Sequence, residues 1–156
     1  MANSNALDDT LHRYLDTLAD FLRALHLPEI HNIRREPMQD GSRLLILGGA
    51  DDRLNIEAAR GEITIEFGES HWHLTPDEDD ASSTLLQCTR DVMKVLLGEW
   101  VTYSAWRDGR ALGGGCREDV ATILENCKAF FPTADHVVVK QFGLESETYS
   151  LRTTDT

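Results

Sequence analysis

The stretch LNIEAARGEITIEF, residues 54–67, is the most informative about the fold because apolar and polar residues alternate in two consecutive runs. A period of two places the apolar side chains on one face of an extended strand. The alternating apolar residues are Leu54, Ile56, Ala58, Ile63, Ile65 and Phe67. Only Arg60 and Gly61 separate the runs, which suits a tight turn between antiparallel strands. The stretch therefore predicts a hairpin with one buried face and a polar face carrying Glu62, Thr64 and Glu66.

Helical spacing appears on both sides of this hairpin. Leucines recur at positions 7, 11, 15, 18, 22 and 25, which predicts an amphipathic first helix that ends before Pro28. Similar spacing predicts a second helix over 82–97, capped by Asp80 or Ser82, whose buried stripe contains Leu85, Leu86, Val92, Met93 and Leu96. A third helix is predicted to begin near Val120 and to stop at Pro132. Residues 29–42 contain helix breakers and mixed charge, so we interpret them as a loop.

Further strand-like runs are RLLILGG (43–49), WVTYSAW (100–106), HVVVKQF (136–142) and ETYSL (147–151). RDGR at 107–110 is a strong signal for a two-residue turn, whereas GGG at 113–115 is interpreted as a break in the chain. The order of elements predicts an α+β fold: one domain over 1–156, with an antiparallel sheet partly covered by about three helices. Residues 1–6 and 153–156 are expected to be disordered ends.

The chain is strongly acidic, with 15 Lys and Arg against 27 Asp and Glu and a net charge of −12. Residues 51–100 contain 12 acids and 4 basic residues, so the charge is concentrated in the middle of the sequence. Such a field repels nucleic-acid phosphates and anionic membranes and attracts a cationic partner. We expect no nucleic-acid or membrane partner. Solubility alone is the other explanation of the acidity.

Cysteine usage and the N-terminal sequence predict a cytoplasmic protein. The three cysteines, Cys88, Cys116 and Cys127, lack metal-type spacing and are interpreted as reduced, partly buried thiols. The N-terminus MANSNALDD does not have the pattern of a signal peptide, and no run approaches the length of a membrane span.

The segment ESHWHLTPDEDD, residues 69–80, raises the question of a metal site. On an extended strand His71 and His73 project from one side and could hold one ion. A catalytic zinc site needs a third protein ligand, for which Asp77 and His136 are among the candidates. We interpret the histidines as surface residues and assign no metal and no cofactor. A metal-dependent enzyme that uses His71 and His73 stays open as an alternative.

Catalysis by other groups has little support in the sequence. Cys116 follows three glycines, but no placed histidine base or recognisable protease signature accompanies it. The acids Asp77, Glu78, Asp79 and Asp80 are consecutive and solvated, so nothing predicts raised pKa values suited to acid–base work. The chain is therefore predicted to be no enzyme, with no catalytic residues.

Aromatic residues next to these acids favour a protein-binding surface. Trp72 lies close to the acidic run, and Trp106 lies on the strand before the RDGR turn. Interface centres favour Trp and Tyr ringed by polar groups. Both tryptophans could equally be part of a core.

Three segments resemble the small bacterial immunity-type proteins that accompany secreted polymorphic toxins. They are ITIEFGESHWHL, VTYSAWRDGRALGGG and HVVVKQFG, and the resemblance covers about residues 54–151. His71 and His73 match the paired histidines of that pattern, and Trp106, Asp108 and Gly109 match its W-x-D-G element. Phe142–Gly143 departs from the expected tryptophan–x–glycine.

The resemblance implies a non-catalytic immunity protein that binds and neutralises a cognate toxin or effector with a basic face. The predicted partner-binding residues are Glu69, His71, Trp72, His73, Asp77, Glu78, Asp79, Asp80, Trp106 and Asp108. The alternatives are a type III secretion chaperone, which is also small, acidic and α+β, and the metal-dependent enzyme. Whether the chain forms a homodimer through a strand edge stays open.

Overall fold

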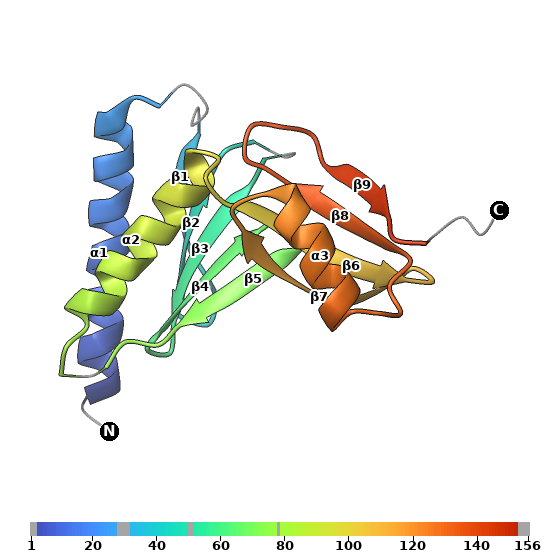
Figure 1. Cartoon of the computed structure of the whole chain (residues 1–156). Helices are drawn as coiled ribbons and strands as arrows, with labels where there is room; N and C mark the ends of the chain where they lie inside the picture. The colour runs from blue at the N-terminus through green and yellow to red at the C-terminus, as the bar shows by residue number, and fades with distance from the viewer. Residues whose placement is uncertain (1–2, 28–31, 50–51, 78, 153–156) are drawn as a thin grey trace. The chain divides into compact units, whose positions relative to one another are not determined.

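A computed structural model describes residues 3–27, 32–49, 52–77 and 79–152, and it confirms the α+β fold (Figure 1). The described residues form helices and two antiparallel sheets. They divide into two compact units. The N-terminal unit comprises 1–67 and 71–93, and the C-terminal unit comprises 68–70 and 94–156. Residues 3–6, expected in a disordered end, belong to the first helix, whereas 1–2 and 153–156 lie outside the described residues.

A five-stranded sheet forms the centre of the N-terminal unit. Its strands follow one another in sequence and in space. They are β1 (Ile33–Pro37), β2 (Arg43–Leu47), β3 (Leu54–Ala59), β4 (Glu62–Phe67) and β5 (Ser70–Leu74). The alternation in 54–67 has the predicted result, because Ile56 pairs with Ile65 and both are fully buried. The same alternation leaves Glu62 and Thr64 half-buried and Glu66 exposed on the polar face.

The predicted loop at 29–42 contains strand β1. This strand pairs with β2 and lies at the edge of the sheet. Ile33 is half-buried, and the other residues of the strand are exposed. An edge strand of this kind carries no alternating apolar pattern, so the sequence gives no periodic signal for it. HWHL, which directly follows the hairpin, lies in the separate fifth strand.

The helices of the N-terminal unit bury one face each. In α1 (Asn3–Leu25) the buried leucines are Leu11, Leu15, Leu18 and Leu22, and the helix contacts β1, β2 and β3. In α2 (Ser82–Leu96) the buried face contains Cys88 and Val92, whereas Leu86, expected in the buried stripe, is exposed. Asp80 Oδ1 accepts a hydrogen bond from the Ser82 amide at the start of α2, as the predicted cap requires.

A four-stranded sheet and one helix form the C-terminal unit. The strands lie in the order β7-β6-β8-β9. Their bounds are β6 (Val101–Arg107), β7 (Arg110–Arg117), β8 (His136–Lys140) and β9 (Glu147–Ser150). Helix α3 (Val120–Phe130) packs on one face (Figure 1), where Ile123 and Cys127 join Tyr103, Val137 and other strand residues in a buried cluster. The predicted turn is confirmed, with Asp108 and Gly109 both at positive φ between β6 and β7.

The three glycines at 113–115 do not break the chain but continue β7. They allow close packing: a Cβ on Gly114 would lie 2.2 Å from the carbonyl oxygen of Tyr103. Ser70 lies on the same side, where its hydroxyl donates hydrogen bonds to the carbonyl oxygens of Tyr103 (2.7 Å) and Gly115 (3.3 Å). Residues 68–70, which comprise the turn after β4 and the first residue of β5, thus belong to the C-terminal unit.

No helix among the described residues is both long enough and apolar enough to cross a membrane.

Candidate functional site

The polar face of the five-stranded sheet carries the two histidines singled out in the sequence. His73 Nδ1 lies 2.7 Å from Glu62 Oε1 and 3.1 Å from Thr64 Oγ1. The His71 and His73 rings lie edge to face, with centroids 5.2 Å apart. Both imidazoles are exposed. The strand geometry thus brings these two residues together as predicted, and it adds Glu62 as a partner of His73.

Among the described residues, no third protein side chain joins His71 and His73 as a metal ligand. Within the described ranges, no three or more His, Cys, Asp or Glu side chains are grouped so that they could hold one metal ion. Asp77 and His136, the sequence candidates for that position, therefore do not complete a three-ligand centre. A catalytic zinc site of the usual kind needs three protein ligands.

Trp72 lies on the opposite face of β5 from the histidines and holds α2. Its indole N–H donates to Asp91 Oδ2 at 3.2 Å, and Gln87 Nε2 donates to Asp91 Oδ1 at 2.6 Å. Asp91 is buried, so these charge-assisted hydrogen bonds replace the hydrogen bonds that its carboxylate would otherwise form with water. Trp72 is half-buried, and only its exposed part is open to a partner.

A buried polar cluster next to Asp91 joins α1 and α2. The Tyr14 hydroxyl and Thr89 Oγ1 share a hydrogen bond of 2.8 Å. Burial raises the pKa of Tyr14 strongly, and burial raises the pKa of the Cys88 thiol to about 12 although its hydrogen bond to Tyr14 acts in the other direction. A thiol with such a pKa is not a nucleophile at neutral pH. The cluster therefore holds the helices together and is not suited to catalysis by Cys88.

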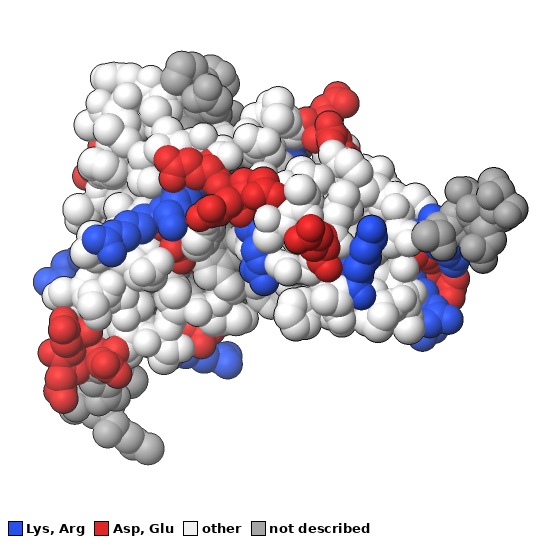
Figure 2. All heavy atoms as spheres, viewed as in Figure 1, with Lys and Arg blue, Asp and Glu red and all other residues white. Residues whose placement is uncertain are grey.

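The acidic segment, defined here as Asp77, Asp79 and Asp80, is exposed and has no ion-pair partner among the described residues. Figure 2 shows acidic side chains gathered at the lower left of the view, over the loop that leads into α2. No ion pair joins these three carboxylates to a Lys, Arg or His within the part of the chain that the structure describes. Glu78, the fourth predicted acid, lies outside the described residues.

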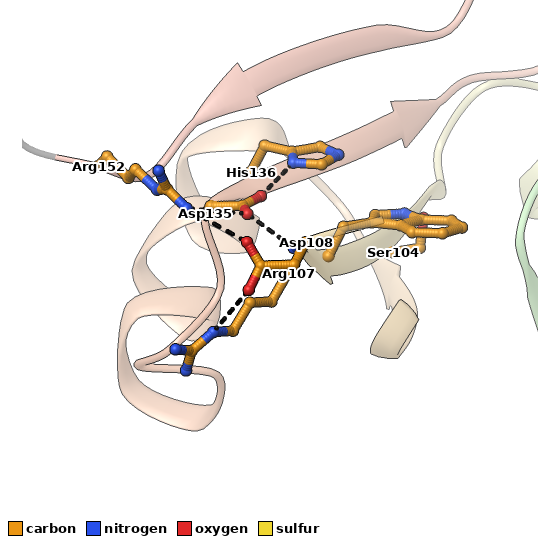
Figure 3. Close-up of polar contacts among 7 residues, drawn as sticks. Ser104, Arg107, Asp108, Asp135, His136 and Arg152 are labelled. Atoms are coloured by element: carbon orange, nitrogen blue, oxygen red, sulfur yellow. Dashed lines mark hydrogen bonds and ion pairs between the residues drawn. The ribbon is translucent and has the colours of Figure 1, made fainter. Parts of the chain in front are cut away.

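In the C-terminal unit, Asp108 belongs to a polar cluster at the end of the β6–β7 hairpin (Figure 3). Trp106 lies next to this cluster on β6. Trp106 is half-buried and its ring is nearly parallel to that of His136, with centroids 6.4 Å apart. The Trp106 indole N–H donates to Ser104 Oγ at 2.7 Å. The Asp108 side chain is exposed and lies 3.5 Å from Arg107 Nε.

Asp135 organises this cluster. Its Oδ2 accepts hydrogen bonds from the Asp108 amide at 2.9 Å and from Arg152 Nη2 at 3.2 Å, and its Oδ1 accepts one from His136 Nδ1. The Asp108 amide, followed by His136, lowers the pKa of Asp135. No local sequence pattern marks Asp135, because its partner Asp108 is 27 residues away and only the pairing of β6 with β8 brings them together.

The predicted binding residues are thus divided between the two units. The N-terminal unit contains His71, Trp72, His73, Asp77, Asp79 and Asp80, and the C-terminal unit contains Glu69, Trp106 and Asp108. Glu69 is exposed in the turn between β4 and β5. Each group is described within its own unit.

Two hollows of the N-terminal unit lie away from these residues. A hollow of about 360 Å³ is lined by Asp8, Asp9, His12, Asp40, Gly41, Ser42, Ala59 and Arg60. Another, of about 300 Å³, lies beside Asp16, which forms ion pairs with Arg35 (2.8 Å) and Arg43 (3.6 Å). None of the predicted binding residues lines either of them.

Comparisons with protein-family models, with curated proteins and with solved structures found no match for this chain. The candidate site therefore depends on the residues and geometry described above.

Proposed function

We propose that this protein is a non-catalytic immunity-type protein of the cytoplasm that binds and neutralises a toxin with a basic face. The observation that carries the proposal is the acidic segment: three neighbouring exposed carboxylates without an ion-pair partner in the described chain. Other acids of the same unit, such as Asp16 and Glu62, are paired with cationic groups or histidine. Charge that a fold leaves uncompensated is available to a partner.

Electrostatics gives the reason why such a surface suits an inhibitor. A toxin that acts on nucleic acid has a basic groove, and an acidic protein can occupy the place of the phosphates. Charges at the edge of an interface mainly accelerate association and make it depend on salt. Half-buried Trp106, beside His136, offers the kind of aromatic side chain that anchors complexes.

Where a secreted protein is encoded next to this chain, it serves as the toxin candidate. Its expression in a bacterial host should arrest growth, and coexpression of this chain should restore growth. With purified proteins, the triple variant Asp77→Asn, Asp79→Asn, Asp80→Asn should associate about tenfold more slowly at low salt and show a weaker salt dependence.

A matched control removes the same charge elsewhere. Glu118, Glu125 and Glu145 are exposed acids of the C-terminal unit, and changing all three to Gln should leave the association rate nearly unchanged. Equal slowing in both triple variants would indicate an effect of net charge alone and would contradict a localised acidic surface. No complex and no rescue of growth would contradict the immunity function itself.

The same experiment distinguishes a type III secretion chaperone. A chaperone would bind an extended segment of the candidate partner, and a peptide from that segment would compete for binding. An immunity protein would bind only the folded toxin domain.

A further inference from the structure

His73 is held by a carboxylate in the way that metal-binding histidines are held. As a carboxylate Glu62 only accepts, so in the neutral imidazole the 2.7 Å contact places the proton on His73 Nδ1 and leaves the Nε2 lone pair free. Metal-ligating histidines usually donate their other ring N–H to a carboxylate or carbonyl, which fixes the tautomer and the ring orientation. The Glu62–His73 pair therefore presents an unprotonated imidazole nitrogen at an exposed site.

The second histidine lies at the separation that a shared ion requires. With metal–nitrogen distances of about 2.0–2.1 Å, an imidazole centroid lies about 3.2 Å from the metal, so two rings at a tetrahedral angle have centroids about 5.2 Å apart. The His71 and His73 centroids are 5.2 Å apart. Because the His71 side chain is exposed, its ring can turn to direct a nitrogen at the same point.

We propose that His71 and His73 bind one divalent late first-row transition-metal ion, with Glu62 as the residue that positions His73. Water fills the other coordination positions, because no third His, Cys, Asp or Glu within the described ranges joins the group. Imidazole ligands favour copper, zinc and nickel over calcium and magnesium. The exposed carboxylate of Glu66, on the same face, adds to the attraction for cations.

The site should prefer Cu²⁺ over Ni²⁺ and Zn²⁺, as expected for nitrogen ligands without an imposed geometry. The metal-free chain is titrated with each ion in turn by calorimetry, and Ni²⁺ or Cu²⁺ is located by paramagnetic broadening of backbone amide signals. We expect one ion per chain, with broadening centred on β4 and β5. Mg²⁺ at the same concentration should produce no such binding.

Matched variants test the ligands. The pair His71→Asn, His73→Asn should abolish this binding. The control pair His12→Asn, His26→Asn, on and just after α1, should retain it. Equal binding by the two pairs, or no binding by the unchanged chain, would overturn the proposal.

The role of Glu62 has its own control. Glu62→Ala should weaken binding by about tenfold, the lower end of what loss of a carboxylate behind a ligating histidine costs. Glu57 is on the same face and, in the part of the chain that the structure describes, has no contact with His73, so Glu57→Ala should have a much smaller effect. Equal weakening by both changes would show that Glu62 supplies only negative charge. All of these measurements use the chain alone, so their outcome is independent of any toxin.

Discussion

Among single residues, Asp135 accepts more side-chain hydrogen bonds than any other described carboxylate in the C-terminal unit. Besides its three side-chain contacts, its amide donates to the Trp106 carbonyl (2.8 Å) and its carbonyl accepts from the Leu151 amide (2.9 Å). One residue thus connects the β6–β7 turn, the start of β8 and the segment after β9. The amide of Asp108, in the exposed turn, finds a charged acceptor in Asp135.

Asp135→Asn should lower the thermal stability at neutral pH, because the amide is a weaker acceptor and cannot form the charge-assisted bonds to His136 and Arg152. The lowered pKa of Asp135 means that its carboxylate stabilises the folded state above the unfolded-state pKa of about 3.9. This contribution is lost as the pH falls through the lowered pKa.

Thermal melts from pH 7 down to pH 2 check this prediction. The difference in Tm between the two proteins should be largest near neutral pH and should shrink in acid, where Asp135 is protonated. Asp79→Asn changes the same group at an exposed position without an ion pair among the described residues and should have little effect at any pH. A Tm difference that stays constant down to pH 2 would argue against the charged acceptor.

The sequence led to part of this cluster. Trp106 and Asp108 match a W-x-D-G element, His136 was named only as a candidate metal ligand, and Asp135 and Arg152 were not singled out. Pairs such as Trp106 and His136 face each other only because β6 and β8 are antiparallel neighbours. The register between strands so far apart in the sequence depends on the packing of the whole sheet, and no local pattern encodes it.

Among the helices and strands, periodicity predicted best where one face of an element is buried. Strands β3 and β4 and helix α1 follow their apolar spacing. Strand β1 has no such face. The glycines at 113–115 were interpreted by composition, which is ambiguous: glycine marks either a break or a close approach of backbones. In β7 it marks the second.

Gly114→Ala should destabilise the protein by about 2 kcal/mol or more, the range for inserting a methyl group into a tightly packed site. The added Cβ would lie 2.2 Å from the Tyr103 carbonyl oxygen, and a paired backbone has little room to move. Urea denaturation gives the free energy of unfolding. Gly49→Ala serves as the control and should be nearly neutral, because no heavy atom of the described residues lies within 4 Å of the position that its methyl group would take and its φ is not positive.

Across the whole molecule, the two units are interleaved along the chain. Residues 68–70 leave the N-terminal unit, complete the C-terminal unit, and the chain then returns at His71. The fold class was predictable from the order of elements, but the division of the strands into two sheets was not. That division depends on which edges stay unpaired, a property of tertiary packing.

Ser70→Ala should therefore act on the C-terminal unit although Ser70 begins a strand of the five-stranded sheet. Loss of the buried hydroxyl removes its bonds to Tyr103 and Gly115, at a cost of about 1–2 kcal/mol. Hydrogen exchange followed by mass spectrometry should show faster exchange in β6 and β7. Ile56→Val, in the core of the N-terminal unit, should instead affect β2 and β3. Faster exchange confined to β3 and β4 in Ser70→Ala would contradict this assignment.

The assignment of residues 68–70 to the C-terminal unit also affects how the gene can recombine. A gene segment that begins at codon 94 would carry only part of the C-terminal unit, because codons 68–70 would remain with the other parent. A single crossover between diverged copies of the gene would thus combine Ser70 from one copy with the glycine-containing strand β7 from the other. Recombination should therefore keep the codons of the two units together. Chimaeras that exchange the C-terminal unit should be recovered only when two further crossovers flank codons 68–70 and exchange them as well.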